Sequence, residues 1–178
     1  DYTNALQVIE DYAESDGDGT ASAPTASDFD LAGVAVVSPA GAIDSELIDA
    51  VNTALAAAPM AGENADTTAE VQAIVDDYAS VIGAAAADPG SLNLSDSDYA
   101  TLGVTGVDAD GATLLNSILP GKTVGEVDTT AALQTLAEQA QAVVALADDA
   151  GSAPDVSKAD LEALGVTGIT SDNLAAIL

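Results

Sequence analysis

The chain has 178 residues, of which 30 are Asp or Glu and only two are basic, so its formal net charge is −28. Such an acidic surface repels phosphate backbones and anionic lipid head groups, which argues against nucleic acid and membrane surfaces as partners. Apolar residues make up 48% of the chain but aromatic residues only 3%, which favours thin helical cores over a deep pocket for a large cofactor.

The first predicted element is a helix that begins at Thr3 with the sequence Thr-Asn-Ala-Leu-Gln-Val-Ile. The same pattern, Thr-x-x-Val/Leu-Gln-x-Ile/Leu, returns at Thr68 and again at Thr130. Threonine is one of the residues favoured at a helix start. The chain therefore contains three predicted helices of one kind, and the first of them lies at its N-terminus.

An acidic loop follows, in which Glu14, Asp16 and Asp18 occupy the first, third and fifth positions of a pattern that has Gly19 at the sixth. An EF-hand loop opens in this way, so the pattern predicts a calcium site with these three acids as ligands. The twelfth position is Thr25, where an EF-hand needs a bidentate Glu. The alternative is a solvated linker, since acidic loops are common on acidic proteins. No other metal or cofactor is expected.

Three short helices are predicted, each after one of three prolines that stand at equal intervals, since 89 − 24 = 65 and 154 − 89 = 65. Each helix opens with the pattern Ser/Thr-x-x-Asp, in which the hydroxyl residue caps the helix and the acid reaches back to the same end. Each ends at a glycine suited to the left-handed conformation that closes a helix. The prolines are Pro24, Pro89 and Pro154, the caps are Thr25, Ser95 and Ser157, the acids are Asp28, Asp98 and Asp160, and the closing glycines are Gly33, Gly103 and Gly165.

A second helix is predicted shortly after each closing glycine. Its start signals are Ser38, Asp108 and Thr170, and Ser38 is followed by Pro39, a residue favoured at the first helical position. The apolar residues between positions 43 and 55 fall on one stripe of the first such helix.

These elements predict an all-α fold of tandem three-helix-bundle repeats of about 65 residues. Residues 1–23 supply the third helix and linker of an incomplete repeat, 24–88 and 89–153 are full repeats, and 154–178 supply the first two helices of another. The predicted core is Phe29, Val34, Ile43, Leu47, Val51, Val71, Ile74 and Tyr78 in the first full repeat, and Tyr99, Leu102, Val104, Leu114, Ile118, Leu133 and Leu136 in the second.

No catalytic residue is predicted, and we do not expect an enzyme. Residues 121–123, Gly-Lys-Thr, are similar to the end of a phosphate-binding loop, but Asn116 replaces its earlier glycine and a helix precedes it instead of a strand. The adjacent acids Asp76 and Asp77 do not face each other on a helix, and the chain has no His, Cys or Arg to act with them.

The pattern Asp-x-x-x-Leu-Gly-Val-Thr-Gly-Ile/Val is complete at 98–107 and 160–169 and partly kept at 28–37. Through it the chain resembles the Ala- and Asp-rich helical repeats of giant bacterial surface adhesins, over nearly its whole length. This resemblance implies a cell-surface stalk or biofilm attachment factor without catalytic residues. A weaker similarity, at 102–104 and 122–126, is to the albumin-binding three-helix modules of bacterial surface proteins. The longer period and the missing lysines mean that albumin binding is not carried over.

The expected function is that of a non-enzymatic structural protein of the cell surface or extracellular matrix, as an adhesin stalk or a filament subunit. Its expected partners are further copies joined head to tail through the incomplete end repeats, or neighbouring repeats of a longer chain, with no membrane insertion. The alternative is a module whose exposed helical faces bind a host or matrix protein. The acidic composition predicts a saline, extracellular setting, where a screening length of roughly 4–5 Å relieves self-repulsion.

Overall fold

The computed structural model describes residues 2–15, 17–39, 44–57, 64–86, 92–148 and 156–174. All regular elements in these ranges are helical, so the predicted all-α class is confirmed. The short helices are α2 (Ala26–Leu31), α5 (Asp96–Thr101) and α8 (Lys158–Ala163), and those of middle length are α1 (Tyr2–Glu14), α3 (Asp44–Leu55) and α6 (Ala109–Ile118). The longest are α4 (Thr68–Ala86) and α7 (Thr130–Asp148), and two 3-10 turns, η2 (Leu119–Gly121) and η3 (Val124–Glu126), follow α6.

The three short helices begin and end as their local sequences predict. At the start of α5, Ser95 Oγ accepts the N–H of Asp98 at 3.3 Å, and the Asp98 carboxylate accepts the N–H of Ser95 at 2.7 Å. The same capping box forms at the starts of α2 and α8. The closing glycines Gly33, Gly103 and Gly165 have φ angles of 73°, 76° and 86°, in the left-handed region that glycine enters without strain.

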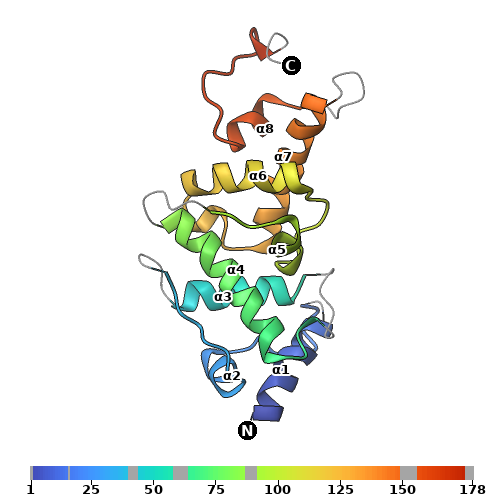
Figure 1. Ribbon diagram of the computed structural model, residues 1–178, viewed down its shortest axis with the longest axis vertical. Helices are drawn as coiled ribbons and strands as arrows, with labels where there is room; N and C mark the ends of the chain where they lie inside the picture. The colour runs from blue at the N-terminus through green and yellow to red at the C-terminus, as the bar shows by residue number, and fades with distance from the viewer. Residues whose placement is uncertain are drawn as a thin grey trace.

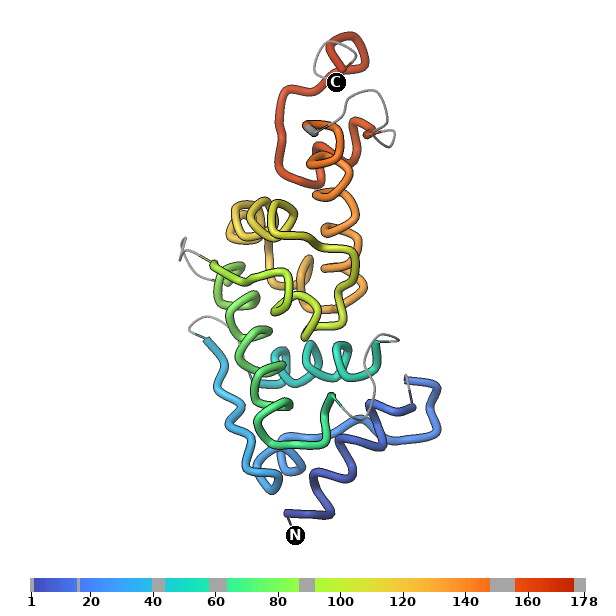
Figure 2. The backbone as a smooth tube through the Cα atoms, turned by 45° about the vertical axis from the view of Figure 1, so that its right-hand side comes forward, coloured from blue at the N-terminus to red at the C-terminus, as the bar shows by residue number. Residues whose placement is uncertain are grey.

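The segment between α2 and α3 is described only as far as Pro39, so its predicted helix start stays a prediction. Ser38 and Pro39 are not helical, and the first described residue of α3 is Asp44. The described segment up to Pro39 runs beside α4 (Figure 2), and a Cβ added to Gly83 of α4 would lie 3.1 Å from the Pro39 ring. Pro39 therefore packs against the long helix, and the start of α3 after Pro39 lies outside the described residues.

The predicted start of α6 is confirmed. Asp108 caps this helix, because its carboxylate accepts the N–H of Gly111 at 2.8 Å. At the third predicted start, Thr170 and Asn173 exchange bonds of the same kind: the N–H of Thr170 donates to Asn173 Oδ1 at 2.7 Å, and the N–H of Asn173 donates to Thr170 Oγ1 at 3.2 Å. The described part of the chain ends at residue 174, one residue further on.

Each of the two long helices packs against the helix before it and against elements after it. α4 packs against α3, which precedes it, and against α5 and η2, which follow it. In the same way α7 packs against α6 and α8, and it also contacts α3. α1 packs against α2 and α3. The result is an elongated stack with the two termini at opposite ends of its long axis (Figure 1).

One cluster of buried residues extends from Ala5 to Leu164, across the repeat boundaries predicted at positions 24, 89 and 154. Most of the predicted core belongs to it: Phe29, Val34, Leu47, Val51, Val71, Ile74, Tyr78, Tyr99, Leu102, Val104, Leu133 and Leu136 are all buried. Leu114 and Ile118 pack against this cluster with part of their surface exposed, and Ile43 lies outside the described residues. A second, small cluster surrounds α8. The boundaries remain predictions, but the helices on either side of them share a core.

Candidate functional site: the joints between helices

The acidic loop after α1 contains two described acids of the predicted calcium site. Glu14 is exposed at the end of α1, and Asp16 lies outside the described residues. Asp18 Oδ1 accepts the Oγ1–H of Thr20 at 2.6 Å and its N–H at 2.8 Å, and these bonds lower the pKa of Asp18. Among the described residues, no three His, Cys, Asp or Glu side chains are grouped so as to hold a metal ion. The calcium site stays a prediction.

The Gly-Lys-Thr sequence at 121–123 makes structural contacts. The Lys122 ammonium donates to the carbonyl of Ala163 in α8 and lies 4.0 Å from a carboxylate oxygen of Glu126. Thr123 caps η3, since its N–H and its Oγ1–H both donate to Glu126 Oε2, at 2.9 and 2.7 Å. This region therefore links the end of the α6 segment to α8.

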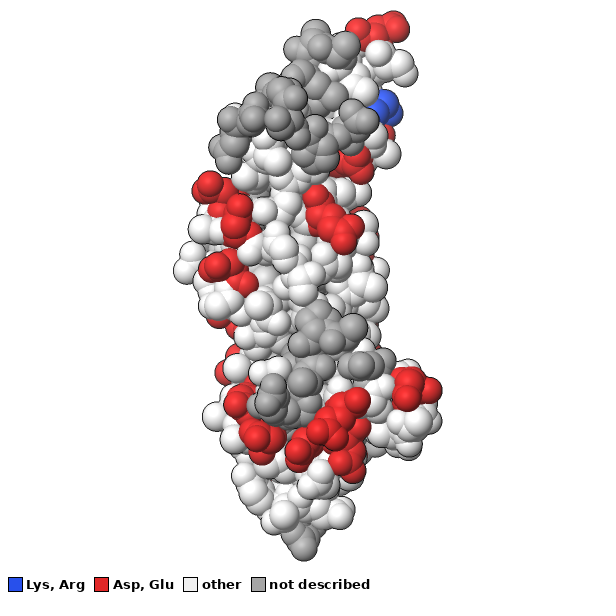
Figure 3. Space-filling model, turned by 90° about the vertical axis from the view of Figure 1, so that its right-hand side faces the viewer, with Lys and Arg blue, Asp and Glu red and all other residues white. Residues whose placement is uncertain are grey.

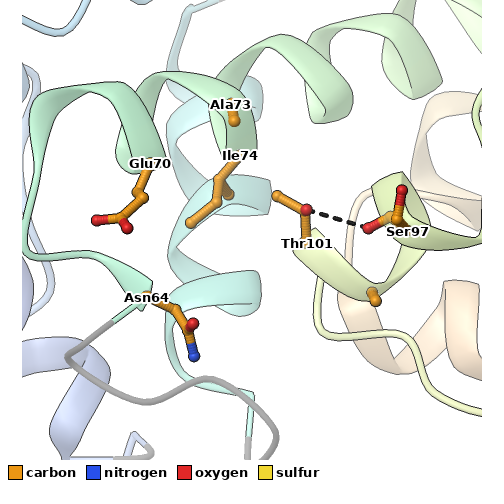
Figure 4. Close-up of a pocket in the computed structure, with 7 residues that line it drawn as sticks. Asn64, Glu70, Ala73, Ile74, Ser97 and Thr101 are labelled. Atoms are coloured by element: carbon orange, nitrogen blue, oxygen red, sulfur yellow. Dashed lines mark hydrogen bonds between the residues drawn. The ribbon is translucent and has the colours of Figure 1, made fainter.

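A cavity of about 310 Å³ lies between α4 and α5 (Figure 4). It is lined by Glu70 and Ile74 of α4 and by Ser97 and Thr101 of α5. Two of its polar side chains have local partners: Thr101 Oγ1 donates to the Ser97 carbonyl at 3.1 Å, and Glu70 accepts the Oγ1–H of Thr67 at 2.7 Å. Both bonds are local to one helix, a hydroxyl bonded to the carbonyl four residues before it and a capping box, so the geometry of each helix accounts for them.

A glutamine near the start of each long helix binds the backbone of the segment that follows a short helix. Gln72 of α4 accepts the N–H of Ala35 at 2.7 Å and donates to its carbonyl at 3.1 Å. Gln134 of α7 binds Thr105 in the same way, at 2.8 and 3.2 Å. We call this pair of bonds the glutamine clamp. The local sequence predicts no role for these glutamines, although both belong to the repeated Thr-x-x-Val/Leu-Gln pattern.

A threonine at the start of each long helix makes a second repeated contact. Thr68 Oγ1 donates to the carbonyl of Ala32 at 2.8 Å, and Thr130 Oγ1 donates to the carbonyl of Leu102 at 3.0 Å. Ala32 and Leu102 are the C-cap residues of α2 and α5. Carbonyls at a helix end lack partners within their own helix, so each threonine satisfies one of them. We call the place where the start of a long helix meets the end of a short helix a joint: the first is between α4 and α2, and the second is between α7 and α5.

At the second joint the hydroxyl groups form a buried network. Tyr78 Oη lies 3.1 Å from Thr130 Oγ1 and 3.3 Å from Thr53 Oγ1, and Thr53 Oγ1 accepts the N–H of Thr130 at 2.9 Å. Tyr78 is fully buried, and this burial raises its pKa to about 12. The network joins α3, α4 and α7, and a hydroxyl left unpaired there would cost about 1–3 kcal/mol.

Loss of the glutamine clamp should destabilise the chain. We expect Gln134→Ala to lower the free energy of unfolding by about 1–2 kcal/mol, because the two clamp bonds to the Thr105 backbone and the longer bond from the Thr105 hydroxyl, at 3.4 Å, disappear. The matched control is Gln7→Ala, since Gln7 occupies the same place in the helix pattern and donates to Asp11 of its own helix at 2.8 Å, as Gln134 donates to Glu138 at 3.1 Å, but forms no clamp among the described residues. Urea denaturation of dilute protein measures both values. Equal losses for the two variants would contradict a stabilising role for the clamp.

Asp77 is a half-buried acid of α4 that makes stability depend on pH. Burial, followed by the charges of Asp98 and Asp76, raises its pKa to about 7. The folded state therefore binds this proton more tightly than the unfolded chain does, and the resulting stability is lost as the pH rises through about 7. We expect Asp77→Asn to raise the melting temperature above pH 7 and to change it little near pH ~4. An equal gain at both pH values, or the same pattern in the exposed control Asp49→Asn, would contradict this assignment.

Acidic side chains are spread along the face shown in Figure 3, and one basic side chain is visible towards its C-terminal end. No helix in the described ranges combines the length and the apolar character that a membrane span requires. A scan of protein-family models and searches of curated proteins and of solved structures gave no match to this chain. The repeated contacts at the joints are therefore the features on which a functional proposal rests.

Proposed function

We propose that this chain is a non-enzymatic structural segment of the cell surface or extracellular matrix, built as tandem three-helix-bundle repeats of about 65 residues that form a stalk or filament. The observation that supports this function is the recurrence of the glutamine clamp, once between Gln72 and Ala35 and once between Gln134 and Thr105. The same contact in two successive units gives these units the same internal arrangement, which a stalk of tandem repeats needs and a catalytic site does not.

Rigid joints support the same function. Each long helix packs against helices before and after it, so bending at a joint would separate buried side chains. The hydroxyl network of Tyr78, Thr130 and Thr53 adds polar bonds at one joint. A stalk holds its two ends at a fixed distance, and continuous packing along the axis provides this.

The composition supports an extracellular and saline setting. A net charge of −28 opposes compact folding at low ionic strength, and salt screens this repulsion. The resemblance of residues 98–107 and 160–169 to the repeats of giant surface adhesins supports the same setting. In this proposal the partners of the chain are repeats of its own kind, and neither nucleic acid nor a membrane interior is among them.

Replacement by an unrelated spacer tests this function. An antibody against the chain should first label intact cells of the source organism. An unrelated helical spacer of equal length, put in place of the chain, should then preserve surface attachment, and a spacer of half the length should weaken it. If the spacer of equal length abolishes attachment, the exposed faces of this chain bind a partner and the structural proposal is wrong.

A further inference from the structure

The segment after α8 exposes groups that its two counterparts bury. Val34 and Val104 directly follow the closing glycines of α2 and α5 and are 4% and 1% exposed, whereas Val166, at the same place after α8, is 42% exposed. A Cβ added to Gly103 would lie 3.3 Å from the first residue of α7, but one added to Gly165 would meet nothing within 4 Å. A long helix packs beside the first two segments, and the third lacks one among the described residues.

The third segment also lacks a glutamine clamp among the described residues. Thr167 is the counterpart of Ala35 and Thr105, because each lies two residues after a closing glycine. Those two residues are held by glutamine clamps, whereas Thr167 has no backbone hydrogen bond within the part of the chain that the structure describes. The segment is thus complementary to a helix that presents a glutamine in its first turns.

The helix α1 has the required pattern. Gln7 occupies the place in α1 that Gln72 and Gln134 occupy in α4 and α7. Its amide donates to Asp11 at 2.8 Å, just as the other two donate to an acid four residues further along their helices, at 2.8 and 3.1 Å. The amide orientation that forms the clamp in α4 and α7 is therefore supported in the same way in α1, where the side chain is exposed.

The apolar residue before this glutamine also indicates that α1 fits the segment after α8. Val71 and Leu133 precede the clamping glutamines and are 0% and 1% exposed. Their counterpart Leu6 packs against the core with part of its surface still exposed. Docking on an apolar segment would complete the burial of Leu6, as it does for the other two.

We propose that α1 of a second copy of the chain docks on the segment after α8, with Gln7 forming a glutamine clamp on the backbone of Thr167 and Val166 becoming buried. This inference rests on the proposed function, because it names the contact by which one structural segment joins the next. α1 and α8 lie towards opposite ends of the molecule (Figure 1), so the contact is heterologous, and it extends into a filament unless the rotation between copies closes it into a ring.

Charge opposes this contact, because each copy has a net charge of −28. Salt screens the repulsion between copies but does not weaken apolar burial or the two clamp bonds. Association is therefore expected to increase with the concentration of NaCl. A contact held by ion pairs would show the opposite dependence.

Sedimentation velocity of the full chain in near-molar NaCl tests the proposal. Oligomers should grow with protein concentration. Gln7→Ala removes the clamping amide and Thr167→Pro removes the N–H that it accepts, so each should weaken association by about tenfold or more. Thr167→Ala keeps the N–H and should associate as the unchanged chain does. Far-UV circular dichroism verifies that each variant is folded, which the exposure of both positions favours.

Mixing the two defective variants gives the decisive result. The Gln7→Ala chain keeps an intact C-terminal segment, and the Thr167→Pro chain keeps an intact α1. An equal mixture should form a 1:1 dimer and nothing longer. A chain that stays monomeric at high concentration and salt, variants that associate normally, or a mixture without the dimer would each overturn the proposal. None of these outcomes affects the spacer function, because covalently joined repeats need no docking between copies.

Discussion

Leu102→Asp is expected to lower the free energy of unfolding by about 3–5 kcal/mol, the largest effect of any single change considered for this chain. Leu102 is 0% exposed, and its own carbonyl accepts the hydroxyl of Thr130. An aspartate at this place would either bury a charge among apolar side chains or take up a proton, and both outcomes cost free energy. Urea denaturation followed by far-UV circular dichroism measures the loss.

Leu31→Asp is the matched control for this change. Leu31 ends the equivalent short helix α2 and is 48% exposed. The same substitution there should cost less than about 1 kcal/mol, since surface changes away from special features have small effects. Similar denaturation midpoints for the two variants would show that the joint at α5 does not bury Leu102 in solution.

Gly103→Ala should also be strongly destabilising, by roughly 2–5 kcal/mol, because two costs add. The φ of Gly103 is +76°, which strains any residue with a Cβ. The new methyl group would in addition lie 2.6 Å from the Cβ of Ala57, which follows α3, and neither group is a flexible side chain that can move aside. The packing between α3, α5 and α7 would have to open.

Gly165→Ala separates these two costs. Its φ is +86°, but a Cβ there would meet nothing within 4 Å. Backbone strain alone should therefore destabilise this variant, by about 1–2 kcal/mol. The difference between the two melting temperatures, measured on dilute monomer, reports the packing at the joint. Equal shifts would mean that Gly103 matters only for its backbone conformation.

The features predictable from the sequence are those that neighbouring residues determine. Ser95 and Asp98 satisfy each other within one turn, so the start of α5 does not depend on the rest of the fold. The same holds for Asp108 at the start of α6. The apolar residues at positions such as Val71 and Ile74 are buried because a three-residue spacing places them on one helical face.

The features that the sequence did not reveal depend on residues far apart in the chain. The clamp joins Gln72 to Ala35, 37 residues away, and no local pattern specifies that partner. Pro39 has the local signal of a helix start and also lies against Gly83 of α4, a contact between distant residues. The loops at the predicted boundaries are typical of connectors between separate units, so no local signal indicates that each long helix takes part in two joints. That arrangement follows from packing alone.

Because each long helix takes part in two joints, a stretch of sequence from one short helix to the end of the next long helix contains both halves of a joint. A duplication of such a stretch in the gene, in frame, inserts a copy whose first helix fits the long helix before it and whose long helix fits the short helix after it. No new interface has to evolve. The length of the rod can therefore change by recombination in whole units, and related sequences are expected to differ in the number of copies sooner than in the residues of the clamp.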